Sequence, residues 1–211
     1  MERWLHPAFE ARLRSHDWLG RRVLDVGTRY GNLALLLAEL GAEVLGIDRD
    51  AAALAEARTS GAGTARVTFV AADAEAAEYR SLLPGLTDVT AHLCMSEGIV
   101  RRAAAALPIG GRFLFCAHHP DHHREIGRAA TYGMEETQLE RVLRDTGLVP
   151  EYLGTHMGAE EYVSWGALRE ALPRQVAHWE EEGLAEGLQK RFESGSRTLT
   201  RAHVVGDVVK A

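Results

Sequence analysis

Two glycines and an acid near the N-terminus have the types and spacing of a site for a nucleotide-like ligand. Gly27 follows the short apolar run 23–26, and Gly31 opens a largely apolar segment that ends at Gly41. A glycine turn between a strand and a helix lets the backbone approach a ligand closely and directs unpaired helix N–H groups toward it. Asp48 ends the next apolar run, where a carboxylate can accept hydrogen bonds from the two hydroxyls of a ribose.

Four histidines form a second group with the types for chemistry, in the sequence HHPDHH at 118–123. This run directly follows an apolar run, and the carboxyl edge of a parallel sheet is where open α/β folds bind ligands. Histidine suits proton transfer, since its unperturbed pKa is about 6.5. We expect His118 or His119 to act as a general base and His122 and His123 to contact the substrate. A solvated loop and a shared divalent ion are the alternatives, and we predict no metal.

Short β-branched runs that alternate with helical segments would position both groups. Such alternation predicts a parallel sheet covered by helices on both faces. The expected strands are 22–27, 43–48, 66–71, 88–95 and 111–117, and the expected helices between them are 31–40, 51–60, 75–83 and 97–106.

The glycine spacing identifies the type of nucleotide-like site. A dinucleotide site has the pattern G-x-G-x-x-G, but Arg29 and Asn32 stand at the second and third positions. The segment instead resembles the first motif of the class I S-adenosylmethionine-dependent methyltransferases, in which an acid precedes the glycine turn and another acid ends the second strand. Arg29 replaces the middle glycine of that motif, and the matching residues are Asp25, Gly27, Gly31 and Asp48.

Three further segments resemble this family in the same order. They are a β-branched run ending at Asp73, a Leu-Pro-Ile-Gly-Gly turn at 107–111, and a helix at 135–147. The resemblance covers roughly residues 20–156. It implies a single methyltransferase domain over residues 1–211, with a doubly wound, Rossmann-like α/β fold. The sheet would have seven strands, mostly parallel, with strands at 148–157 and 200–210 and the last strand antiparallel beside the sixth.

The resemblance also implies the cofactor, S-adenosylmethionine, and the residues that hold it. Asp25 would orient the glycine loop, Asp48 would hold the ribose hydroxyls, and Asp73 with Ala74 would contact the adenine. Arg29 would reach the cofactor carboxylate or point to solvent. The expected cofactor-binding residues are Asp25, Gly27, Thr28, Arg29, Gly31, Asp48, Arg49, Asp73, Ala74, Met95 and Ser96.

Two segments lie outside the family motifs. Residues 1–19 predict a leading helix that packs on the core or on the cofactor entrance. Residues 158–196 predict a helical insertion between the last two strands, with two helices broken near Pro173. The insertion would form a lid, pack plainly on the body, or provide the face of a homodimer. We expect Tyr162 and Trp165, with Tyr132, to contact the substrate.

The implied function is methyl transfer, a transferase reaction of the EC 2.1.1 type, to oxygen or nitrogen of a small molecule. A catalytically degenerate cofactor-binding scaffold and an RNA- or protein-modifying enzyme are the alternatives. The net charge of −6 argues against a nucleic-acid partner. The absence of a long apolar segment argues against a membrane span, and Cys94 and Cys116 in expected buried strands suit reduced thiols. We therefore expect a cytoplasmic protein.

Overall fold

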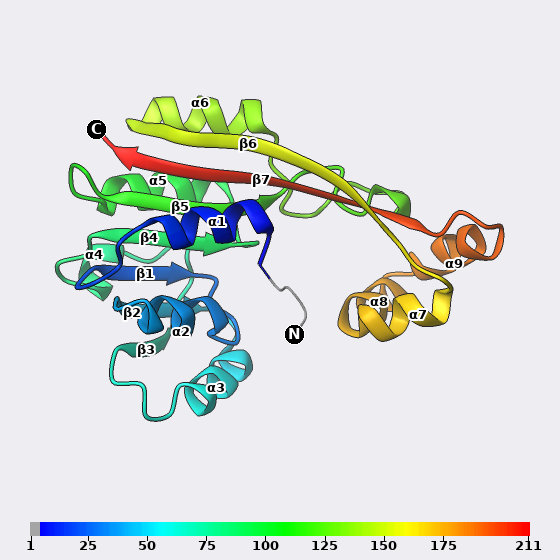
Figure 1. Cartoon of the computed structure of the whole chain (residues 1–211), viewed down its shortest axis with the longest axis horizontal. Coiled ribbons are helices and arrows are strands. Elements are labelled where there is room, and N and C mark those ends of the chain that lie inside the picture. The colour runs from blue at the N-terminus through cyan, green and yellow to red at the C-terminus, as the bar shows by residue number, and fades with distance from the viewer. Residues whose placement is uncertain (1–4) are drawn as a thin grey trace.

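A computed structural model describes residues 5–211, so residues 1–4 of the leading helix expected over 1–19 lie outside the described residues. The chain forms a seven-stranded sheet in the order β3-β2-β1-β4-β5-β7-β6. The first five strands pair in parallel, and β7 runs antiparallel to both β5 and β6 (Figure 1). The strands are β1 (Arg22–Val26), β2 (Glu43–Asp48), β3 (Val67–Ala71), β4 (Asp88–His92), β5 (Arg112–His118), β6 (Leu148–Glu161) and β7 (Thr198–Lys210). This topology confirms the predicted fold class.

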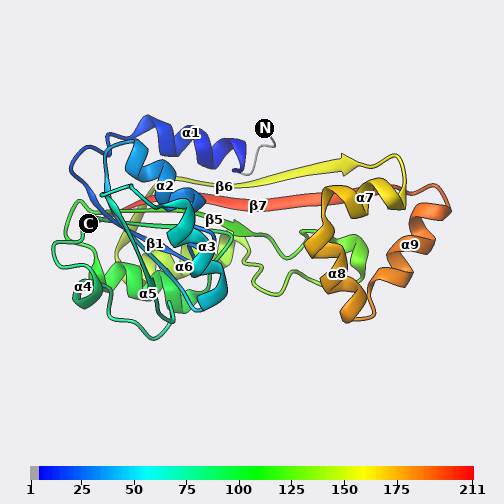
Figure 2. The ribbon, with the colours of Figure 1, turned by 90° about the horizontal axis from the view of Figure 1, so that it is seen from below.

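Helices cover both faces of the sheet, because its central strands are apolar on both sides. One face packs against α1 (Pro7–Ser15), α2 (Asn32–Glu39) and α3 (Ala51–Ser60). The other packs against α4 (Tyr79–Leu82), α5 (Glu97–Ala106) and α6 (Glu136–Thr146). Figure 2 shows α1 and α2 on one side of the strands and α5 and α6 on the other. Within the described part of the chain, no helix is both long and apolar enough to cross a bilayer.

The last two strands extend beyond the rest of the sheet and carry a separate helical unit (Figures 1 and 2). Their pairing continues as far as Glu161 opposite Thr198. Beyond it lie α7 (Trp165–Ala171), α8 (Pro173–Glu181) and α9 (Ala185–Glu193), which enclose a small apolar core of their own around Trp179 and Phe192. A short 3₁₀ helix, η1 (Arg124–Ile126), follows β5 and packs against α9 and β7.

Several predicted boundaries were wrong. The sixth strand continues through residues 158–161, which were assigned to the insertion, and the helical unit has three helices instead of two. The first break is at Pro173 as predicted, and a second break follows at Gly183, which has a φ of +73°. The expected strand 88–95 ends at His92, because Leu93 adopts a φ of +59° and turns the chain out of the sheet. The expected helix 75–83 is reduced to α4 because a turn follows Asp73, whose Oδ1 accepts a hydrogen bond from the backbone N–H of Glu75 at 2.8 Å.

Candidate active site

The turn between β1 and α2 leaves no room for side chains at its two glycines. Gly27 has a φ of +69°, and a Cβ atom there would lie 2.4 Å from the Cβ of Cys94. Gly31 has a φ of +79°, and its Cβ would lie 2.6 Å from the ring of Phe69. Arg29 between them has a φ of +49°, in the left-handed region that glycine occupies most readily. The loop therefore needs glycine at both ends, whereas Arg29 between them carries an exposed side chain.

Asp48 fixes this loop to the end of β2. Its Oδ2 accepts a hydrogen bond from the backbone N–H of Arg29, and its Oδ1 accepts one from the backbone N–H of Asp50, both at 2.9 Å. Each carboxylate oxygen has two lone pairs, so the group keeps acceptor capacity for a ligand. The half-buried carboxylate is thus held in one orientation at the carboxyl edge of the sheet.

Asp25 lies beneath the same loop and is almost completely buried. Its Oδ1 accepts a hydrogen bond from the hydroxyl of Thr90 at 2.9 Å. Its Oδ2 and the hydroxyl of Thr28 are both buried without a hydrogen-bond partner among the described residues. Burial raises the pKa of Asp25 to about 7, because a charged carboxylate is poorly solvated there. The loop therefore packs on buried polar groups, some of which lack a hydrogen-bond partner among the described residues.

A cavity of about 240 Å³, here called the loop cavity, opens between the ends of β1, β2, β3 and β4. Ser96 on its wall caps α5 by accepting a hydrogen bond from the backbone N–H of Ile99 at 3.2 Å. Seven of the eleven residues predicted to bind the cofactor line this cavity, together with Tyr132. These seven are Gly27, Asp48, Arg49, Asp73, Ala74, Met95 and Ser96.

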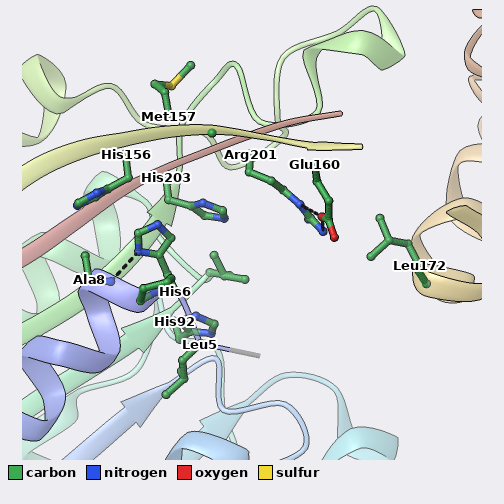
Figure 3. A pocket seen from close by; sticks show the side chains of 14 residues that line it. Leu5, His6, Ala8, His92, His156, Met157, Glu160, Leu172, Arg201 and His203 are labelled. Carbon is green, nitrogen blue, oxygen red and sulfur yellow. Dashed lines mark hydrogen bonds and ion pairs between the residues drawn. The ribbon is translucent and has the colours of Figure 1, made fainter. Parts of the chain in front are cut away.

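A larger cavity of about 930 Å³, the histidine cavity, lies beside the first. Figure 3 shows the rings of His6, His92 and His203 close together on its wall, with His156 nearby. Arg201 and Glu160 form an ion pair at its far side, with Nε and Oε2 2.7 Å apart. Leu5, Leu93, Met157 and Leu172 supply apolar surface, and Leu93 also lines the loop cavity.

The strand register explains why these histidines converge. His203 on β7 pairs directly with His118 on β5 and with His156 on β6, so the three side chains lie on one face of the sheet. His6, which caps α1, places its ring 4.8 Å from that of His156 and 5.1 Å from that of His203, measured between centroids. Burial lowers the pKa of His92 to about 4 and of His203 to about 3, so both rings are neutral at pH 7.

A third cavity of about 650 Å³, the arginine cavity, lies between the histidine loop and α8. Arg29 and Arg174 line it and place their guanidinium carbons 5.1 and 4.6 Å from the ring centroid of Tyr30. Its other lining residues include His118, His122, His123 and Tyr132. Arg29 therefore extends toward α8, and it does not line the loop cavity.

The structure separates the residues predicted to act on the substrate. His118, His122 and His123 line the arginine cavity, whereas His119 lines none of the three cavities and accepts a hydrogen bond at Nδ1 from the backbone N–H of Asp121. Tyr162 and Trp165 pack in the core of the helical unit and also line none of them, so their predicted contact with a substrate is not supported. Their aromatic rings fill the separate apolar core of the helical unit, which does not join the core of the main sheet.

Sequence reasoning missed four residues that line the histidine cavity. His6, His92, His156 and His203 are not among the residues that the sequence predicted for the site. The signal was present only in part: His156 and His203 occupy the expected last two strands, but their pairing depends on a register that the sequence does not show. Leu93, with its left-handed backbone, was also missed; such strain in a bulky residue is typical of functional sites.

Comparisons with known proteins agree with this fold. Residues 23–107 match a family model described as a methyltransferase domain. The YcgJ protein of Bacillus subtilis has a similar structure, with a TM-score of 0.71 and 16% identity over 98% of this chain and 99% of that chain. An S-adenosylmethionine-dependent methyltransferase from Mesorhizobium loti gives a TM-score of 0.62 and 21% identity, with 96% of each chain covered.

A third solved structure is phosphoethanolamine N-methyltransferase 2 of Haemonchus contortus, in complex with phosphomonomethylethanolamine and S-adenosylhomocysteine. Its TM-score is 0.64 at 20% identity, and the match covers 96% of this chain and 52% of that chain. None of the curated proteins compared with this sequence matches it.

Proposed function

We propose that this chain, a class I S-adenosylmethionine-dependent methyltransferase by its fold and by the sequence of residues 23–107, methylates a small molecule. The small molecule would bind in the histidine cavity. The observation that carries this proposal is that Leu93 lines both the loop cavity and the histidine cavity. Ligands in the two cavities therefore meet at one residue, as an in-line displacement between them requires.

The residues of the loop cavity fit S-adenosylmethionine, which supplies an electrophilic methyl group on a sulfonium when it is bound. Gly27 allows the backbone to approach the ligand, because a side chain there would collide with Cys94. Asp48 would accept hydrogen bonds from the ribose hydroxyls with a carboxylate that two backbone N–H groups already orient. Asp73 and Ala74 on the cavity wall would contact the adenine.

His92 accepts the proton of the acceptor. It is the last residue of β4, directly before Leu93, and its neutral ring has an acceptor nitrogen at pH 7. With S-adenosylmethionine supplying the methyl group, His92 would hold the proton that the acceptor oxygen or nitrogen must lose. We assign this role to His92 in place of His118 and His119, because neither of those residues lines the histidine cavity.

The helical unit covers the acceptor. Ala171 and Leu172, at the end of α7, line the histidine cavity opposite its histidines. A unit carried on two long strands can exclude water from the acceptor once it is bound, which is the common role of a lid. This contact supports the lid over the alternatives of plain packing and a dimer face.

A small-molecule acceptor agrees better with the surface than RNA does. The chain has two pairs of adjacent arginines, at 21–22 and 101–102, that could contact phosphate. One arginine of each pair is engaged with an acid: Arg21 binds Asp88 through two hydrogen bonds of 2.7 Å, and Arg102 pairs with Glu78. Both cysteines are free, which supports a reducing compartment such as the cytoplasm.

The test begins with calorimetric titration of S-adenosylhomocysteine, for which we expect one site per chain. A panel of small phenols, hydroxy acids and amines is then assayed for release of S-adenosylhomocysteine from S-adenosylmethionine. For any acceptor that turns over, His92→Ala should lower kcat by about 10² to 10⁴ and leave cofactor affinity unchanged. His178→Ala is the matched control, because His178 is exposed on α8 and outside the histidine cavity.

Failure to bind S-adenosylhomocysteine would overturn the cofactor assignment and leave a degenerate scaffold. Undiminished turnover by His92→Ala would overturn only the base assignment, since methyl transfer by positioning alone would then suffice.

A further inference from the structure

Three histidines from distant parts of the chain form a compact cluster that the proposed methyl transfer does not use. His118 ends β5, His122 follows in the loop, and His203 lies on β7. Each contributes one ring nitrogen, and the three nitrogens all lie within 4.8 Å of one another. We propose that this cluster, the three-histidine site, binds one divalent transition-metal ion.

Two backbone features hold the rings together. The antiparallel register pairs His118 directly with His203, which places both rings on one face with centroids 5.4 Å apart. A tight turn then returns His122 to the same face, since its backbone N–H donates to the carbonyl of His119 at 2.9 Å. Its ring centroid lies 4.2 Å from that of His118 and 4.5 Å from that of His203. The site is therefore built by sheet register and a turn.

The spacing suits a metal ion. A Zn–N bond of about 2.0–2.1 Å in a tetrahedral site places ligand nitrogens roughly 3.3 Å apart. Nitrogens that start within 4.8 Å reach that spacing by small rotations of the side chains. The ring of His118 has no hydrogen bond to lose at Nδ1, which is buried and lacks a partner among the described residues.

His122 must lose a hydrogen bond in order to bind a metal ion. Its Nδ1 accepts a hydrogen bond from the backbone N–H of Ala202 at 3.2 Å. Coordination through Nδ1 would use the same lone pair, and coordination through Nε2 would require the proton on Nδ1, so either mode releases this bond. A length of 3.2 Å is at the long end for N–H donors, so the hydrogen bond that is released is a weak one.

The donor set defines the class of metal. Three imidazoles without a carboxylate favour zinc, copper, nickel, cobalt or iron over magnesium and calcium, which prefer oxygen ligands. Arg201 contacts His123 beside the cluster at 3.0 Å, but its charge is offset by its ion pair with Glu160. Three protein ligands leave a coordination position open, and His203 also lines the histidine cavity (Figure 3). A bound ion would therefore adjoin the acceptor.

The experiment uses the untagged full-length chain, stripped with a chelator and titrated with Zn²⁺ against a chromophoric competitor. We expect one tight site per chain, and Co²⁺ at the same site should give visible bands of a low-coordinate complex. His118→Ala and His203→Ala should each weaken binding by more than the roughly 10- to 100-fold that loss of an outer-shell partner costs. His122→Ala should also weaken it.

His119→Ala is the matched control, because His119 is adjacent to His118 but outside the cluster. Its Zn²⁺ affinity should equal that of the parent. Circular dichroism and S-adenosylhomocysteine affinity verify that each variant is folded, and neither readout depends on metal. The proposal is overturned if the parent binds no stoichiometric Zn²⁺, or if His119→Ala weakens binding as much as His118→Ala, which would indicate adventitious surface binding.

Discussion

Replacing Gly27 by alanine tests whether the glycine loop has the packing on which the cofactor site depends. The new Cβ would lie 2.4 Å from the Cβ and 2.5 Å from the Sγ of Cys94, far inside contact distance. A side chain in the left-handed region costs about 1–2 kcal/mol. Forcing an extra carbon into packed surroundings costs about 1–3 kcal/mol more. The free energy of unfolding should therefore fall by roughly 2–5 kcal/mol, measured by urea denaturation.

Gly20→Ala separates the two contributions. Gly20 has nearly the same φ, +71°, but a Cβ there would meet no atom within 4 Å. This control should lose only the backbone contribution, about 1–2 kcal/mol, and keep its affinity for S-adenosylhomocysteine. Gly27→Ala should lose at least about tenfold in that affinity, or 1.4 kcal/mol, because Cys94 must move and it lines the loop cavity. Equal losses of stability in the two variants, with cofactor binding intact in both, would refute the reasoning.

Three further predictions concern the same loop. Asp48→Ala should weaken S-adenosylhomocysteine binding by about 1–3 kcal/mol in calorimetry, because the ribose loses its charged acceptor; unchanged affinity would show that the carboxylate does not bind ligand. Arg29→Gly should keep that affinity within about tenfold, because Arg29 points into the arginine cavity, and a much tighter site would show that the natural loop is impaired. Asp25→Asn should change the pH dependence of stability. The pKa of Asp25 is raised from 3.8 to about 7 in the folded state. The contribution of Asp25 to the free energy of unfolding is therefore complete below pH 3.8 and is lost as the pH rises to about 7. The parent should therefore lose a few kcal/mol relative to Asp25→Asn over that window and then run parallel to it, whereas parallel denaturation profiles throughout would contradict the raised pKa.

Most of the sheet was predictable because its signals are local. Apolar runs that end in glycine or an acid marked β1, β2 and β3 within a residue at each end, and the predicted helix 97–106 agrees with α5. The errors arose where backbone geometry departed from what the residue type indicates. Leu93 ends β4 early because its backbone is left-handed, a conformation that leucine rarely adopts. The turn after Asp73 replaces most of a predicted helix.

The candidate cofactor residues were predicted mainly from the resemblance to the methyltransferase family, which assigned Gly27, Asp48, Asp73 and Ser96 to one site. These four residues line one cavity because parallel strands bring their carboxyl ends to one edge of the sheet. The sequence left open whether Arg29 reaches the cofactor or points to solvent. The direction of its side chain depends on contacts with Tyr30, which Arg174 from the distant helix α8 also contacts.

The sequence by itself determined the succession of strands and helices along the chain, the glycine turn and the acids at its edge, because each depends on residues close together in the chain. Only the tertiary structure decided which histidines meet. His6, His92, His118, His156 and His203 come from five different elements, and antiparallel pairing of β7 with both β5 and β6 is what sets three of them side by side. A shift of that register by one residue would turn His203 to the opposite face. No local pattern records the register, which results from packing of the whole sheet, so the histidine cavity and the three-histidine site could not be read from the sequence.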